Sequence, residues 1–131
     1  MRAFIYLFFA VFVLTVTFCH SFALQQKQEV FSYNVAKLIE YIYCKGYKVT
    51  FGEAFRTSEQ AIYYAQHGLG IVHSQHCERL AVDLNIVDRS GKFLWDADDY
   101  KPFGKYWESL NPSNRSGAFW HRVDADHFEM D

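Results

Sequence analysis

The chain opens with an apolar run that limits what the rest of it can fold into. Arg2 precedes the uncharged stretch Ala3–Phe18, and the small residues Ser21 and Ala23 stand before a cleavage site after position 23. This layout is typical of a secretory signal peptide. Because the run approaches the length that spans a bilayer, an uncleaved membrane anchor over residues 3–19 is the alternative. Either way, residues 24–131 have to form the folded part.

Residues 24–131 are enough for one packed domain and too few for two. They contain 12 Lys and Arg against 15 Asp and Glu. This balance excludes an electrostatic nucleic-acid binder, because neutralising several phosphates needs a basic surface. We therefore expect a signal peptide at 1–23 and a monomeric domain at 24–131, exported to the periplasm or cell surface. Membrane contact is expected only through the N-terminal segment.

Cysteine usage is sparse for an exported domain. Loss of Cys19 with the leader leaves Cys44 and Cys77. Export permits a disulfide between them, but nothing in the sequence brings them together, so two separate thiols are expected. No CxxC pair is present, which disfavours a zinc ribbon or a thioredoxin-like redox site.

Hydrophobic periodicity predicts an α+β fold, with helices packed on a small antiparallel sheet. Three stretches have helical spacing or helix-boundary residues: 25–43, 57–67 and 98–110. Strand-like alternation and turn residues predict strands over 47–51 and 80–86, a hairpin that turns at 88–91 into 92–95, and a closing strand near 123–128.

The predicted strand over 80–86 has an unusual second face. Leu80, Leu84 and Ile86 alternate with Asp83 and Asn85, so one face is apolar and the other carries a carboxylate and an amide. A solvent-facing side would more often carry lysines. The pattern therefore indicates that this second face looks into a cleft.

The histidines favour metal chemistry near that cleft. His76 lies seven residues before Asp83, and His127 lies three residues after Asp124. Catalytic zinc takes three protein ligands from imidazole and carboxylate and leaves a fourth position for water, and His76, Asp83 and His127 would supply this set. Asn85, on the same face as Asp83, is a candidate support for the ligands. Pairs with these spacings also occur by chance, so the metal-site interpretation depends on the surrounding residues.

Those surroundings resemble a known family. The segment SQHCERLAVDLN at 74–85, followed by DADHFE at 124–129 and preceded by VTFGEAFRT at 49–57, is similar to the zinc peptidases of bacterial cell walls. These include D-Ala-D-Ala carboxypeptidases, D-Ala-D-Ala dipeptidases and phage L-alanyl-D-glutamate endolysins. The resemblance covers nearly all of residues 24–131. It implies a zinc site in a cleft on the sheet and hydrolysis of peptide bonds in the peptidoglycan stem.

The resemblance also implies roles for individual residues. It implies that three residues bind Zn²⁺: His76, Asp83 and His127. It implies that Asp124 is the general base and acid, that Arg56 stabilises the oxyanion, and that Ser74 holds the substrate or the ligand strand. A carboxylate such as Asp124 can take a proton from an activated water and deliver it to the leaving amine.

Two departures from the family's common pattern bear on the substrate. Many members have Gly where this chain has Arg79, and the carboxypeptidases and dipeptidases commonly have Glu where it has Asp124. Both residues are similar to the endolysin-like branch, so we expect an L-alanyl-D-glutamate endopeptidase, with a D-alanyl-D-alanine carboxypeptidase as the alternative. A non-catalytic zinc-binding module is a third reading, because the Hedgehog signalling domain shares this fold and metal site. Loss of the base would mark that case, and Asp124 is present.

Several neighbouring residues have ordinary interpretations. Arg56 can be an ion-pair partner of Glu53 or Glu59 instead of an oxyanion donor. Solvated carboxylates are the default for Asp126 and Glu129, which become the next candidates if Asp124 is not the base.

Overall fold

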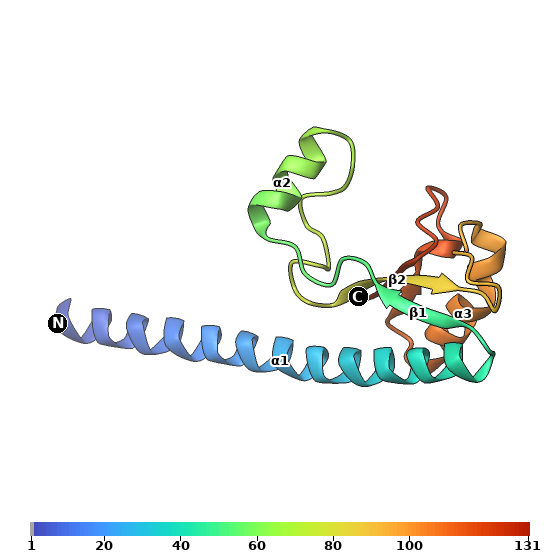
Figure 1. Cartoon of the computed structure of the whole chain (residues 1–131). Helices are drawn as coiled ribbons and strands as arrows, with labels where there is room; N and C mark the ends of the chain where they lie inside the picture. Colours follow the sequence, from blue (N-terminus) through green and yellow to red (C-terminus); the bar gives the residue numbers. More distant parts are fainter. Residues whose placement is uncertain (1) are drawn as a thin grey trace.

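The computed structural model describes the backbone of residues 2–131 and the side chains of residues 21–131. Within this range the fold is α+β, as the periodicity predicts, with helices packed on a four-stranded antiparallel sheet of order β1-β2-β4-β3 (Figure 1). The elements in chain order are α1 (Arg2–Cys44), β1 (Lys48–Phe51), α2 (Ser58–Gln66), β2 (Ala81–Val87), α3 (Ala97–Leu110), β3 (Asn114–Ser116), a 3₁₀ helix (Gly117–Phe119) and β4 (His127–Met130).

Helix α1 is much longer than the helix predicted over 25–43. It runs unbroken from Arg2 to Cys44, so the predicted boundary after Ala23 lies inside it. Its C-terminal half packs on the sheet, whereas its N-terminal half extends beyond the rest of the chain (Figure 1). The leader and anchor predictions depend on residues 1–20, whose side chains lie outside the described residues. Over residues 21–131, whose side chains the structure describes, no helix combines the length and the apolar character needed to cross a membrane.

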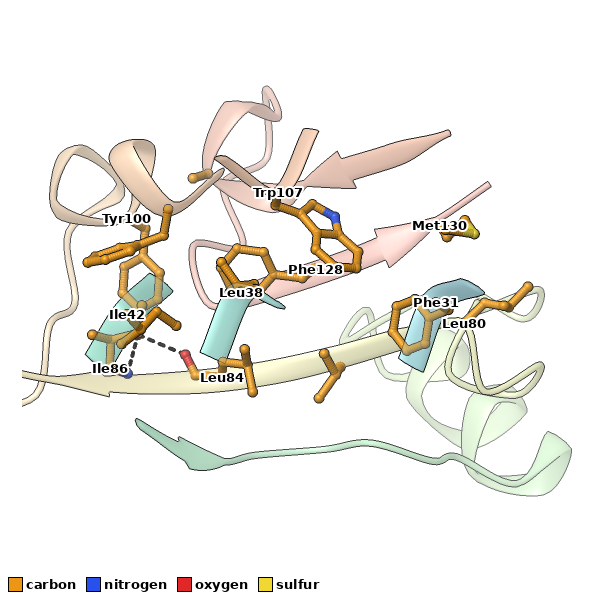
Figure 2. Packing of buried hydrophobic residues seen from close by; sticks show 13 residues of the cluster. Phe31, Leu38, Ile42, Leu80, Leu84, Ile86, Tyr100, Trp107, Phe128 and Met130 are labelled. Carbon is orange, nitrogen blue, oxygen red and sulfur yellow. Dashed lines mark hydrogen bonds between the residues drawn. The ribbon is translucent and has the colours of Figure 1, made fainter. Parts of the chain in front are cut away.

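One face of the sheet builds the hydrophobic core. Leu84 and Ile86 of β2 and Phe128 of β4 are fully buried beneath α1 and α3, as Figure 2 shows. Trp107 of α3 lies between α1 and β4, with its ring centroid 5.7 Å from that of Phe31 and 6.0 Å from that of Phe128. Alternation along β2 and β4 therefore directs every second side chain into this core.

Tyr100 joins α3 to the edge of β2 that β4 does not reach. Its hydroxyl donates to the Leu84 carbonyl at 3.2 Å and accepts from the Ile86 N–H at 3.1 Å (Figure 2). These bonds satisfy buried backbone groups that would otherwise lack a partner.

The other face of the sheet carries the polar residues. Asp83 and Asn85 of β2, with His127 and Glu129 of β4, alternate with the core residues. The antiparallel register pairs Asp83 directly with His127. The sheet thus brings two of the predicted metal ligands, 44 residues apart in sequence, side by side.

Three predicted elements differ from the structure. The closing strand begins at His127 rather than near Val123, because the His127 N–H bonds to the Asp124 carbonyl in a turn. The hairpin after β2 is reduced to a single bridge between Val87 and Phe93. Strand β3 was not predicted, since its three residues Asn114–Ser116 show no apolar alternation. Cys44 and Cys77 are free thiols, as expected.

Candidate metal centre

Asp83 is held by backbone pairing on the side of β2 that faces β1. Its N–H donates to the Glu53 carbonyl and its C=O accepts from the Gly52 N–H, both at 2.8 Å. A Cβ on Gly52 would lie 3.0 Å from the Asp83 Cβ, so glycine leaves room for the carboxylate-bearing side chain. The Asp83 carboxylate then reaches His127 across the sheet, with Oδ1 3.0 Å from Nδ1.

His76 comes from the tight turn that leads into β2. The Cys77 N–H closes this turn on the Ser74 carbonyl at 2.9 Å. Arg79, with φ of 56°, takes the left-handed conformation that glycine adopts without steric cost. Its guanidinium lies 4.5 Å from the centroid of the Phe55 ring, a favourable cation–π contact.

The three predicted ligands meet at one point. His76 Nε2 lies 3.2 Å from His127 Nδ1 and 3.3 Å from Asp83 Oδ1, and the third distance, between His127 Nδ1 and Asp83 Oδ1, is 3.0 Å. Zinc bonds of about 2.0–2.1 Å in tetrahedral geometry separate ligand atoms by about 3.3 Å. Both imidazoles are buried, at 1% and 6% exposure. These residues can therefore hold a metal ion at three corners of a tetrahedron and leave the fourth open.

The electrostatics of the site favour a bound cation. Burial opposes ionisation of Asp83, but hydrogen bonds from His127 and His76 outweigh it and lower the pKa of the carboxyl to about 2. Burial likewise disfavours charge on His127, yet its hydrogen bonds to Asp83 and Glu129 raise its pKa to about 9. The metal-free site thus binds a proton on His127, and a metal ion has to displace that proton.

Glu129 contacts His127 on the side away from the other ligands. Its Oε2 lies 3.1 Å from His127 Nε2, and its side chain is only 16% exposed. The default expectation of a solvated carboxylate was therefore wrong for Glu129. The signal in the sequence was the period of two, because His127 and Glu129 share a face of one strand. Among the described residues no side-chain hydrogen bond joins Asn85 to the three ligands, so its predicted supporting role has no counterpart in these contacts.

The three predicted ligands line a pocket of about 540 Å³. One wall comes from the loop between α2 and β2, and the other from the loop before β4. Arg122 of the second loop donates to the Gly68 carbonyl of the first at 2.9 Å, which links the two walls. Besides the predicted ligands and Arg122, the lining includes Arg56, Leu69, Ile71, His73, Ser74, Asp124, Glu129 and Asp131.

Asp124 lies in the lining of this pocket and is exposed. Its backbone is fixed, because its N–H donates to the Gly117 carbonyl and its C=O accepts from the His127 N–H, both at 3.1 Å. A Cβ on Gly117 would fall 2.1 Å from the Asp124 carbonyl oxygen, so only glycine permits this approach. In the described part of the chain its carboxylate has no hydrogen-bond or ion-pair partner, which leaves it available to a proton donor.

Arg56 and Ser74 also line the pocket, and they bond to each other. Arg56 Nη1 donates to Ser74 Oγ at 3.3 Å, and Ser74 Oγ accepts from the His76 N–H at 3.4 Å. The Arg56 guanidinium forms an ion pair with Glu53, with Nε 3.1 and 3.2 Å from the two carboxylate oxygens. The ion-pair interpretation of Arg56 is thus realised, with Glu53 and not Glu59 as the partner. Ser74 thus supports the backbone of His76, one of the predicted metal ligands.

Fold and site together define a class of protein: a small α+β domain in which two histidines and one carboxylate, grouped on the open face of its sheet, could hold a metal ion. Among solved structures, the fold is similar to that of ChiX, an L-Ala D-Glu endopeptidase from Serratia marcescens, with a TM-score of 0.54. Sequence identity is 19%, over 64% of this chain and 67% of that chain, so the likeness concerns the fold alone. No family model matches the chain, and no curated protein matches it by sequence.

Proposed function

We propose that this chain is a zinc-dependent peptidase that hydrolyses the L-alanyl-D-glutamate bond of the peptidoglycan stem. The observation that carries the proposal is the convergence of His76, Asp83 and His127 at tetrahedral spacing in a pocket, on a fold similar to that of an L-Ala D-Glu endopeptidase. The motif resemblance around these residues supports the same activity, as does the aspartate at position 124.

A zinc ion in such a site supplies Lewis acidity, which lowers the pKa of water toward neutrality and polarises a carbonyl group. The free carboxylate of Asp124 accepts the proton of the attacking water as the water oxygen bonds to the carbonyl carbon. The same carboxyl group then delivers that proton to the amine as the carbon–nitrogen bond breaks. His76 and His127, buried and mutually oriented, stay fixed through both steps.

Arg56 keeps donors for the substrate despite its ion pair. A guanidinium has five N–H groups. The Nε–H and one N–H of Nη2 donate to Glu53, and one N–H of Nη1 donates to Ser74. One N–H on each terminal nitrogen remains for the developing oxyanion or for a carboxylate of the stem peptide. Glu53 and Ser74 act here by holding the guanidinium in one orientation.

The site of action we propose is outside the cytoplasm, in the periplasm or at the cell surface, with the domain as a monomer. The leader pattern of residues 1–23 supports export. A fusion of residues 1–30 to a reporter that is active only after export tests this proposal, and an inactive fusion would contradict it.

Cleavage of purified muropeptides by the zinc-loaded chain, followed by mass spectrometry of the products, tests the activity. We expect a new carboxyl terminus on L-alanine and a new amino terminus on D-glutamate, both absent after chelation. Loss of only the terminal D-alanine would replace the proposal with a carboxypeptidase. Retention of zinc without any cleavage would identify a non-catalytic module.

A further inference from the structure

Glu129 has a place in the site that the proposed reaction does not use. Its carboxylate accepts a hydrogen bond at His127 Nε2, while Nδ1 of the same ring faces His76 and Asp83. We propose that Glu129 is a positioning residue for the metal: it fixes the tautomer and the ring orientation of His127. This role rests on the proposed metal site.

The tautomer argument follows from the chemistry of imidazole. A neutral ring has one N–H and one lone pair, and a metal needs the lone pair. An ionised carboxylate only accepts hydrogen bonds, so the Glu129 contact requires the proton on Nε2. The lone pair of Nδ1 then points toward His76 and Asp83, where the metal would lie. A partner of this kind also makes the ligand nitrogen more basic.

The strand framework gives Glu129 a fixed position. Strand β4 lies inside the sheet, and Glu129 is paired with Ala81 of β2 on one side and Arg115 of β3 on the other. Its carbonyl accepts from Trp107 Nε1 at 3.1 Å, which ties this part of β4 to the core.

The other ligands lack an equivalent support. His76 Nδ1 is buried without a hydrogen-bond partner among the described residues, so no carboxylate or carbonyl holds the outer nitrogen of that ring. Asp124 and Asp131 line the same pocket but are exposed, and among the described residues neither carboxylate has a hydrogen bond or ion pair with the predicted ligands. Glu129 is therefore the carboxylate outside the predicted ligand set that supports a ligand, and its described side-chain contact is with His127.

Zinc affinity of the full chain, measured by competition with a chelator, tests this role. Glu129→Ala should weaken zinc binding by about 10–100-fold, the usual effect of losing such a partner. Glu129→Gln retains an oxygen acceptor and should stay within about tenfold of the parent. Asp131→Ala, which removes a carboxylate from the same pocket, is the matched control and should bind zinc like the parent.

A spectroscopic readout separates positioning from general destabilisation. In zinc-loaded parent protein the His127 Nε2–H should give a slowly exchanging, downfield proton signal by NMR, and this signal should be lost in Glu129→Ala. Parental zinc affinity in Glu129→Ala would overturn the positioning role while leaving the metal site intact. Equal loss in Glu129→Gln and Glu129→Ala would also overturn it, because the acceptor would then be irrelevant. Failure of the parent to bind zinc would overturn the metal site and this role together.

Discussion

The floor of the pocket and its rim are built in different ways. The floor is strand β2 paired with β4, where Asp83 and His127 are in register above a packed core, together with the hydrogen-bonded turn before β2 that carries His76. The rim consists of two loops joined by the Arg122–Gly68 hydrogen bond, and it exposes both Asp124 and the apolar residues Leu69 and Ile71. A rigid floor suits metal ligands, whose atoms have to keep fixed separations, whereas loops suit groups that meet a substrate. Metal binding and turnover should therefore be separable by mutation.

Removal of a predicted metal ligand from the floor should have the largest effect on zinc content and activity. In His127→Ala two ligands remain, so we expect zinc content below about half an equivalent and a loss of activity greater than for any rim variant. Metal analysis after purification without chelator, alongside the muropeptide assay, measures both. His73→Ala is the matched control, because this exposed histidine lines the same pocket without contacting the ligands, and it should keep its zinc. Full zinc in His127→Ala would contradict the ligand assignment.

Asp124→Ala tests the rim. Because the carboxylate has no partner in the described structure, zinc content and thermal stability should remain close to those of the parent. Turnover should fall by about 10²–10⁴-fold, the usual contribution of a positioned acid or base. Asp131→Ala, which removes another exposed carboxylate from the same pocket, is the control and should keep parental turnover. Near-parental turnover in Asp124→Ala would show that the base is misassigned and would make Glu129 or Asp126 the next candidate.

The same division explains what the sequence could and could not predict. Alternation identifies β2 and its polar face, because burial of one face imposes a period of two on Asp83 and its neighbours. The start of β4 was misplaced by several residues, since the turn that bonds His127 to Asp124 is set by tertiary contact with Gly117. The contact between Glu129 and His127 was missed because the residue before a buried Met130 looks like an ordinary solvated carboxylate.

The partners of Arg56 show the same limit. Sequence spacing offers Glu53 and Glu59 equally, but Thr57 caps α2 between them, which places Glu59 in the first turn of the helix. Among the described residues only Glu53 pairs with the guanidinium. Which of two nearby carboxylates pairs with an arginine depends on where a helix begins, and loop geometry of that kind is weakly encoded locally.

The pH dependence of zinc binding should report the protonation of His127 in the floor of the pocket. With the pKa of His127 raised to about 9, the metal-free site holds a proton at neutral pH that zinc has to displace. Apparent zinc affinity, measured by chelator competition, should thus rise about tenfold per pH unit up to pH about 9. A flat profile would contradict a proton on His127 that zinc has to displace.

Stability of the metal-free chain should follow the opposite trend. The stabilisation from protonated His127 is complete below its ordinary pKa of 6.5 and is lost as the pH rises through about 9. The lowered pKa of Asp83 gives stabilisation that is fully present above pH 3.8 and is lost as the pH falls through about 2. Chemical unfolding at several pH values without metal would measure both.

The smallest effect should come from the helix that supports the rim. Thr57 caps α2: its side chain accepts from the Gln60 N–H at 3.2 Å, while Gln60 Oε1 accepts from the Thr57 N–H at 2.9 Å. Thr57→Ala should lower the free energy of unfolding by about 1 kcal/mol, the usual cost of losing such a cap. Because α2 leads into the loop that carries Leu69 and Ile71, faster hydrogen exchange in α2 should accompany the loss. Zinc affinity should stay parental, since no ligand lies on α2, and a parallel loss of zinc would show that floor and rim are coupled.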